Sequence, residues 1–281
     1  MKTCIVELKQ EYPFLQGGTL ECLVGECPWD VIEEWKRPAV IVVAGGGYAS
    51  VSKREGEPVA FEFLARGFQV FILRYLVGGE NGAPYPEQLF ELASAVDYIK
   101  KNAKTFAVNP DEVFAVGFSA GGHLTANLAV EYETVSKRVG VSLDCKPTAI
   151  GLGYPVISQK HGHQRSFDNL LFGYTDEAKT ELLKTLNLDE AVSETTPPAF
   201  IWTTAKDTCV PPDNALRYAT ALDRQGIDYE LHVYPRLNHG KSTGNLEINA
   251  YTEEDKAEHR RISRWMGDCV SFFRLYIKEA F

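Results

Sequence analysis

From residue 39 onward, short apolar runs rich in β-branched residues alternate along the chain with longer segments of helical periodicity. Short buried runs between turn residues are typical of strands, and apolar positions three and four apart are typical of helices. In the clearest helical pattern, 87–101, Leu89, Leu92 and Val96 share one side. The pattern predicts strands at 39–43, 68–73, 113–116, 149–153, 199–204 and 229–234. It predicts helices at 55–66, 87–101, 124–130, 176–186, 214–225 and 253–278, the last interrupted near Gly267.

Strands that alternate with helices predict an α/β fold, with a mostly parallel central sheet and helices on both faces. Two earlier strands, 3–8 and 19–24, are expected to add an antiparallel edge, and 109–111 is expected to be a turn. The segment 154–197 breaks the alternation, because it is polar and irregular before its one helix, and we interpret it as a small inserted cap. The whole length, 1–281, is expected to form a single domain.

Charge and composition exclude several classes of partner. A net charge of −9 argues against nucleic acid and anionic membranes. No segment approaches the roughly 18 apolar residues of a membrane-spanning helix. Residues 1–9 lack the apolar core of a signal peptide, and the six cysteines show no C-x-x-C spacing, so we expect reduced thiols in a cytoplasmic protein. The oligomeric state is left open, a homo-oligomer included.

Candidate chemistry centres on 112–127, where a predicted strand turns into a helix through the sequence GFSAG. In this context G-x-S-x-G indicates a nucleophile elbow, a sharp turn that exposes the hydroxyl of Ser119. A serine hydroxyl is a poor nucleophile unless a base takes its proton, and a histidine base needs an acid that fixes its tautomer. The alternative is a glycine-rich turn in which Ser119 has no chemical role.

The partners of such a serine are expected beyond the carboxyl ends of the strands, where parallel sheets bind their ligands. Of the six histidines, His239 alone directly follows a late predicted strand, so we assign it as the base. Asp207 also follows a strand and is assigned as the acid, with helix capping as its alternative role and Asp213 as the second choice. His123 is expected to pack or hydrogen-bond locally. The chain order Ser119, Asp207, His239 is that of α/β hydrolases.

A triple glycine at 45–47 follows the strand 39–43. Glycines at a strand end let the backbone approach a ligand closely and turn its N–H groups inward. Alone this loop could simply be flexible, but together with the serine motif it indicates half of an oxyanion hole.

From residue 39 the chain resembles the α/β-hydrolase superfamily, and within it the bacterial acetyl-xylan esterase and feruloyl-esterase-like carbohydrate esterases related to hormone-sensitive lipase. The resemblance rests on GGGY at 45–48, PYPEQL at 84–89, GFSAGGH at 117–123, KDTCVP at 206–211 and NHG at 238–240. It implies a triad of Ser119, Asp207 and His239. It also implies an oxyanion hole made by the N–H groups of Gly46, Gly47 and Ala120. Ala44 stands where the HGGG motif of the lipase relatives has a supporting histidine, so we expect altered loop bracing and retained catalysis.

The expected reaction is hydrolysis of a short-chain, above all acetyl, ester of a sugar or oligosaccharide through an acyl-enzyme. A generic short-chain carboxylesterase is the fallback. No H-E-x-x-H or comparable cluster occurs, so we expect no cofactor and no metal. A small serine aminopeptidase shares the triad and its order, although 281 residues leave no room for the propeller of prolyl oligopeptidases. A non-catalytic binding protein of the same fold remains a further alternative, and such proteins typically lose a triad residue.

Overall fold

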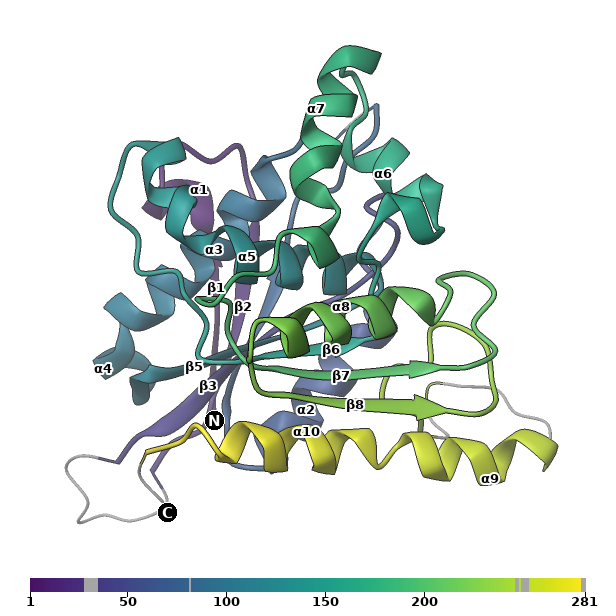
Figure 1. The fold of residues 1–281 in the computed structure, drawn as a ribbon. Helices are drawn as coiled ribbons and strands as arrows, with labels where there is room; N and C mark the ends of the chain where they lie inside the picture. Colours follow the sequence, from purple (N-terminus) through teal and green to yellow (C-terminus); the bar gives the residue numbers. More distant parts are fainter. Residues whose placement is uncertain (28–34, 81, 246–247, 249–252, 279–281) are drawn as a thin grey trace.

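An eight-stranded sheet runs through the computed structural model, which describes residues 1–27, 35–80, 82–245, 248 and 253–278 (Figure 1). The strand order is β1-β2-β4-β3-β5-β6-β7-β8. The strands are β1 (Lys2–Glu7), β2 (Thr19–Val24), β3 (Arg37–Val43), β4 (Gln69–Arg74), β5 (Val108–Phe118), β6 (Ile150–Gly153), β7 (Ala199–Thr204) and β8 (Tyr229–Tyr234). β2 pairs antiparallel with β1 and β4, and every other pairing is parallel. The predicted mostly parallel sheet with an antiparallel edge is therefore confirmed.

Helices cover both faces of the sheet (Figure 1). α3 (Glu87–Lys101), α5 (Ala120–Val139) and α8 (Asp213–Arg224) lie on one face. α2 (Glu57–Ala65), α9 (Glu253–Ile262) and α10 (Trp265–Arg274) lie on the other. The shorter helices are α1 (Leu8–Glu11), α4 (Ala103–Phe106) and the 3₁₀ turns η1 (Lys53–Glu55), η2 (Gln159–His161) and η3 (Leu188–Glu190). No helix in the described ranges is long and apolar enough to cross a bilayer.

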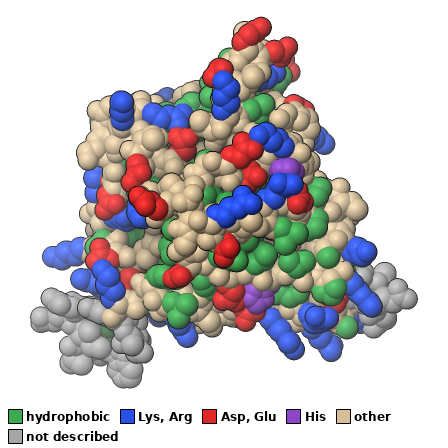
Figure 2. Space-filling model, viewed as in Figure 1, with side chains coloured by type: hydrophobic (Ala, Val, Ile, Leu, Met, Phe, Trp, Pro, Cys, Tyr) green, Lys and Arg blue, Asp and Glu red, His purple; other side chains and the backbone are tan. Residues whose placement is uncertain are grey.

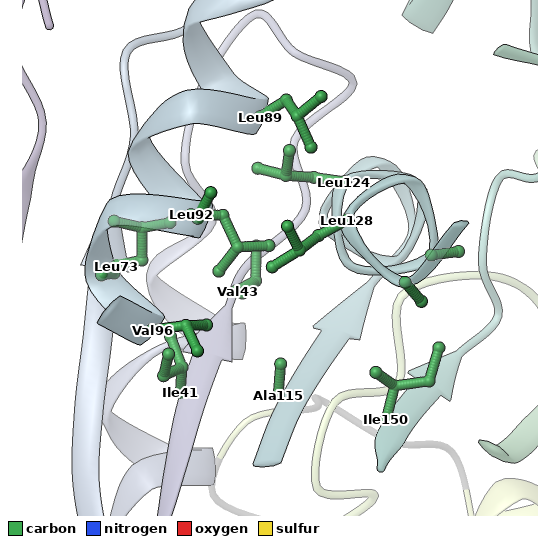
Figure 3. Packing of buried hydrophobic residues seen from close by; sticks show 14 of the residues in the cluster. Ile41, Val43, Leu73, Leu89, Leu92, Val96, Ala115, Leu124, Leu128 and Ile150 are labelled. Atoms are coloured by element: carbon green, nitrogen blue, oxygen red, sulfur yellow. The ribbon is translucent and has the colours of Figure 1, made fainter. Parts of the chain in front are cut away.

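The central strands are buried on both sides, which explains their continuous apolar runs. Along β3, Ile41 and Val43 join the core beneath α3 and α5, whereas Val40 and Val42 face the second core. In Figure 3 the side chains of Ile41 and Val43 pack against leucines and valines of α3 and α5, among them Leu92. This two-sided packing holds the strand ends in a fixed relation to one another.

Several element boundaries differ from the sequence prediction. The residues expected to form a turn at 109–111 lie inside β5, which is accommodated by a shift of register against β3 between Arg37 and Ala39. α5 runs much further in both directions than 124–130. The closing helix is interrupted near Gly267, as predicted: α9 ends at Ile262 and α10 begins at Trp265. The Trp265 ring stacks on Trp202 with centroids 5.3 Å apart, so tertiary packing places this break.

The segment between β6 and β7 contains α6 (Gln164–Leu170) and α7 (Asp176–Leu186). Both helices rise above the sheet, at the top of Figure 1. The predicted helix 176–186 is confirmed, and Thr175 caps it by accepting a hydrogen bond from the N–H of Ala178. Asn169 of α6 donates a hydrogen bond of 2.8 Å to the carbonyl oxygen of Gly47, so this insertion contacts the triple-glycine loop.

Acidic and basic side chains are interspersed on the face shown in Figure 2, while hydrophobic side chains gather over α8 and β8. Leu216 of α8 and Tyr229 and Val233 of β8 are each about two-fifths exposed, at 43%, 39% and 43%. On this face the negative net charge is therefore spread out rather than gathered into one patch.

Candidate active site

Ser119 lies between the end of β5 and the start of α5, with φ 53° and ψ −118°. Its N–H donates to the carbonyl oxygen of Gly153 on the neighbouring β6 at 3.0 Å. The motif's glycines allow a close approach of backbones. A Cβ on Gly117 would lie 2.2 Å from the carbonyl oxygen of Gly121, and a Cβ on Gly121 would lie 2.2 Å from that of Val43. The strained turn and the tight packing together hold the serine at the sheet edge.

The structure brings the three predicted residues Ser119, His239 and Asp207 into one hydrogen-bonded chain. His239 Nε2 lies 2.8 Å from Ser119 Oγ, and His239 Nδ1 lies 2.6 Å from Asp207 Oδ2. A carboxylate only accepts, so Nδ1 carries the proton and Nε2 is left to accept from the serine hydroxyl. Asp207 Oδ1 accepts from the backbone N–H groups of Cys209 and Val210, at 2.9 and 2.8 Å.

The second choice for the acid, Asp213, has other partners. It lies in the first turn of α8, where its Oδ2 is 2.6 Å from Arg217 Nε and 3.1 Å from His161 Nδ1. Its carboxylate supports the helix and a nearby turn rather than His239.

Two residues that the sequence analysis did not single out hold the loops of Asp207 and His239 together. Asn238 Oδ1 accepts from the N–H of Thr208 at 2.9 Å and from the N–H of His239 at 2.8 Å. Tyr154 packs its ring edge-on against the His239 imidazole, with centroids 4.8 Å apart. The position of the imidazole is thus fixed by three loops and not by its own loop alone.

Three backbone N–H groups beside Ser119 have no acceptor in the described part of the chain, those of Gly46, Gly47 and Ala120. Gly46 and Gly47 line the same cavity as Ser119, whereas Ala120 is fully buried at the first position of α5. The N–H of Gly45 is occupied, because it donates to Glu55 Oε2 at 2.8 Å. The free amides are those that the sequence analysis named, and the N-terminus of α5 adds its partial positive charge.

Glu55 braces the triple-glycine loop. Its side chain is only 4% exposed, and its second oxygen, Oε1, accepts from the hydroxyl of Tyr154 at 2.6 Å. Burial, followed by the charge of Glu55, raises the pKa of Tyr154 well above its usual value, so this hydroxyl keeps its proton and donates. Tyr154 Oη also accepts from the N–H of Ser242 at 2.9 Å. The buried carboxylate of Glu55 therefore braces the triple-glycine loop. The sequence analysis had noted only that Ala44 stands where the lipase relatives have a supporting histidine. The position of Glu55 at the start of the predicted helix 55–66 gave no sign of this bracing role.

His123 also lies behind the glycine loop. Its Nε2 lies 3.1 Å from the carbonyl oxygen of Leu186 and must donate to it, so Nδ1 accepts from the Tyr48 hydroxyl at 2.9 Å. Burial lowers the pKa of His123 to about 4, which keeps the ring neutral. His123 packs as expected, with its ring edge-on to Tyr48 and Phe167, but both hydrogen-bond partners of its side chain are distant in sequence.

A cavity of about 440 Å³ opens onto Ser119 and His239. The glycine loop forms one wall, and the insertion between β6 and β7 contributes His163, Arg165 and Asn169. His163 Nδ1 lies 2.6 Å from Ser166 Oγ. A cavity of this size fits a small organic ligand. Within the described ranges no three His, Cys, Asp or Glu side chains gather as a metal site.

Comparison with known proteins gives a consistent set of matches. The model of the BD-FAE family matches residues 31–222. The endo-1,4-beta-xylanase B of Butyrivibrio fibrisolvens is 34% identical over 77% of this chain, and the acetylxylan esterase of Xylanibacter ruminicola is 32% identical over 73%. The crystal structure of an acetyl ester-xyloside bifunctional hydrolase from Caldicellulosiruptor lactoaceticus has a TM-score of 0.79 and 27% identity, and the match covers 97% of this chain and 96% of that one.

The matched region is only part of the two curated relatives. It covers 34% of the xylanase chain and 41% of the acetylxylan esterase chain. The structural neighbour, in contrast, matches along nearly its whole length.

Proposed function

The chain belongs to the BD-FAE family of the α/β-hydrolase superfamily, and from this premise we propose that it is a serine esterase that cleaves short-chain, mainly acetyl, esters of sugars. The observation that carries the proposal is the hydrogen-bonded chain from Ser119 through His239 to Asp207, which lies beside three free backbone amides. In this proposal Ser119 is the nucleophile, His239 the general base and Asp207 the residue that orients it.

In the first half of the reaction, Ser119 Oγ attacks the ester carbonyl while His239 Nε2 takes the hydroxyl proton. The negative charge that develops on the carbonyl oxygen is stabilised by the N–H groups of Gly46, Gly47 and Ala120. Each such donor contributes roughly 3–4 kcal/mol where oxyanion-hole donors have been removed in other enzymes. Asp207 stabilises the imidazolium that forms.

The first half ends when the imidazolium returns its proton to the departing alcohol oxygen and the acyl group stays on Ser119. A water molecule then loses a proton to His239 Nε2 as its oxygen attacks the acyl carbonyl. When this tetrahedral intermediate collapses, the bond from the acyl carbon to Ser119 Oγ breaks, Oγ takes the proton back from His239 Nε2, and the carboxylic acid is released.

The substrate class is inferred from the relatives and from the cavity. One relative is named an acetylxylan esterase, another a xylanase, and a structural neighbour an acetyl ester-xyloside hydrolase. The cavity of about 440 Å³ is small and includes polar side chains such as Ser50, Ser52 and Asn169 in its lining, which suits a short acyl group on a sugar better than a long alkyl chain. We propose that the insertion 154–197 acts as a cap over the bound ester.

Two assays test the proposal together. We expect 4-nitrophenyl acetate to be hydrolysed faster than the butyrate and octanoate esters, and acetylated xylo-oligosaccharides to release acetate. An aminoacyl 4-nitroanilide should be cleaved far more slowly, which separates an esterase from an aminopeptidase. Failure to release acetate from the sugar would contradict the carbohydrate assignment. Failure to cleave any ester would favour a non-catalytic binding protein.

We also propose that the protein works in a reducing compartment, the cytoplasm. None of the six cysteines, all of which lie within the described residues, is joined in a disulfide, and Cys22, Cys145 and Cys269 are buried. Titration with a thiol reagent in denaturant, after isolation without reductant, should count six thiols per chain. A lower count, with cross-linked peptides in mass spectra, would contradict this.

A further inference from the structure

Two arginines line the cavity that contains Ser119, and they come from different parts of the chain. Arg54 lies in η1, next to the bracing residue Glu55, and its carbonyl oxygen accepts a hydrogen bond of 2.5 Å from Ser242 Oγ. Its guanidinium reaches the histidine loop, because Nη2 would lie 3.5 Å from a Cβ placed on Gly240. Arg54 is therefore anchored by its backbone while its guanidinium lies beside Gly240, the residue that follows the proposed base.

The second cation, Arg165, enters the cavity from the inserted cap segment, in the first turn of α6. Its positive charge acts on His163, whose pKa is lowered first by burial and then by the charges of His239 and Arg165. Both guanidinium groups thus lie within electrostatic range of the same small space above Ser119.

Neither arginine is neutralised by a carboxylate in the part of the chain that the structure describes. Arg74 is paired with Glu21 and Arg138 with Glu131, whereas Arg274 is another exposed arginine without an ion pair among the described residues. The one carboxylate in the cavity lining, Glu55, is buried and has both oxygens occupied by hydrogen bonds. What distinguishes Arg54 and Arg165 is that both line the cavity that contains Ser119, in a chain whose net charge is −9.

Guanidinium groups bind carboxylates through paired, charge-assisted hydrogen bonds, and positive charge in a cleft attracts anionic ligands. We propose that the natural ester carries a carboxylate that Arg54 and Arg165 bind while Ser119 attacks. The carboxylate belongs either to an acidic sugar of uronic acid type or to the far end of a dicarboxylic acyl group. This inference rests on the proposed esterase function and adds the charge of its substrate.

Matched pairs of substrates separate the two sources. For the acyl side, 4-nitrophenyl hydrogen succinate is compared with its methyl ester, which has the same acyl chain without the charge. For the sugar side, acetylated xylo-oligosaccharides that carry a glucuronic acid branch are compared with the same compounds after methyl esterification. The measured quantity is the ratio of kcat/KM for the charged substrate to that for its neutral partner.

We expect this ratio to exceed one in one of the two arms and to fall as salt is added, since salt screens exposed charges. Arg54→Gln and Arg165→Gln should each lower the ratio by about fivefold, the upper range for an exposed ion pair. Arg274→Gln, an exposed arginine at the end of α10, is the matched control and should leave the ratio unchanged.

Equal kcat/KM for charged and neutral partners in both arms would overturn the inference and leave the esterase proposal standing. The same holds if both arginine variants behave like Arg274→Gln. If no ester of either kind is hydrolysed, the proposed function itself fails.

Discussion

The buried carboxylate of Glu55 provides a sharp test of how the oxyanion loop is held. Glu55→Gln keeps the shape of the side chain and changes only its hydrogen bonding. In the native protein both carboxylate oxygens face donors, the N–H of Gly45 at 2.8 Å and the hydroxyl of Tyr154 at 2.6 Å. A glutamine has one acceptor oxygen, so its NH₂ group must face one of these two donors.

The expected magnitude follows from that conflict. A buried donor left without an acceptor costs about 1–3 kcal/mol, so the free energy of unfolding should fall by about that amount. If the loss falls on Gly45, the neighbouring amides of Gly46 and Gly47 shift from their positions. Removing one oxyanion donor outright lowers kcat by about 10²–10³, so a displaced loop should lower it by about tenfold.

Urea unfolding and kcat for 4-nitrophenyl acetate measure the two effects in the same preparation. The control is Glu62→Gln on α2, which loses only a partly exposed ion pair with Arg66 and should change the free energy of unfolding by less than about 0.5 kcal/mol. If Glu55→Gln unfolds at the wild-type urea concentration and keeps kcat within twofold, the carboxylate does not brace this loop.

Three further variants probe other parts of the site. Asp207→Asn places an NH₂ group against the imidazole, which then takes the wrong tautomer, so kcat should fall by about 10⁴; a loss below tenfold would exclude an orienting role. Gly45→Ala places a Cβ 2.8 Å from the Ser119 Cβ and should abolish most activity. In Gly47→Ala the added Cβ meets nothing closer than 3.7 Å, so this variant bears only the backbone strain of φ 63°, about 1–2 kcal/mol. Equal losses of Tm and kcat in the two variants would contradict this contrast. Burial lowers the pKa of His123 from 6.5 to about 4, so the unfolded chain takes up the proton first as the pH falls. Stability should drop by up to about 3 kcal/mol between pH 7 and 4 in wild type, and His123→Gln should lack this component of the pH dependence in urea titrations.

Much of the fold could be predicted from local sequence because the relevant burial pattern is local. β7 and β8 match the predicted ranges 199–204 and 229–234, and α3 and α7 match 87–101 and 176–186. Each is marked by an apolar run or a clear helical periodicity, and α7 has the capping residue Thr175. The extension of β5 to Val108 was missed, because the Asn-Pro-Asp residues 109–111 interrupt the pairing with β3, in which Val108 pairs with Arg37 and the next pair is Val113 with Ala39.

The residues of the candidate site also form two groups, those that the sequence could predict and those that it could not. Ser119, Asp207 and His239 could be named from motifs at strand ends, and the structure brings them within hydrogen-bond distance, although their catalytic roles remain predictions. Glu55 and Tyr154 could not be named, because the hydrogen bond between them joins residues 99 positions apart and no local motif marks either one. The roles of supporting residues such as Glu55 and Tyr154 depend on tertiary contacts, which the local sequence does not reveal.

The central claim, that Ser119 is the nucleophile, is tested most directly by a fluorophosphonate probe followed by peptide mass spectrometry. We expect one phosphonyl group per chain, located on the peptide that contains Ser119, with loss of ester hydrolysis in proportion to labelling. Ser119→Ala should take up no probe and should lose at least about 10³-fold in kcat for 4-nitrophenyl acetate while keeping its circular dichroism spectrum. Labelling at another residue, or a Ser119→Ala variant that keeps most of the activity, would contradict the account.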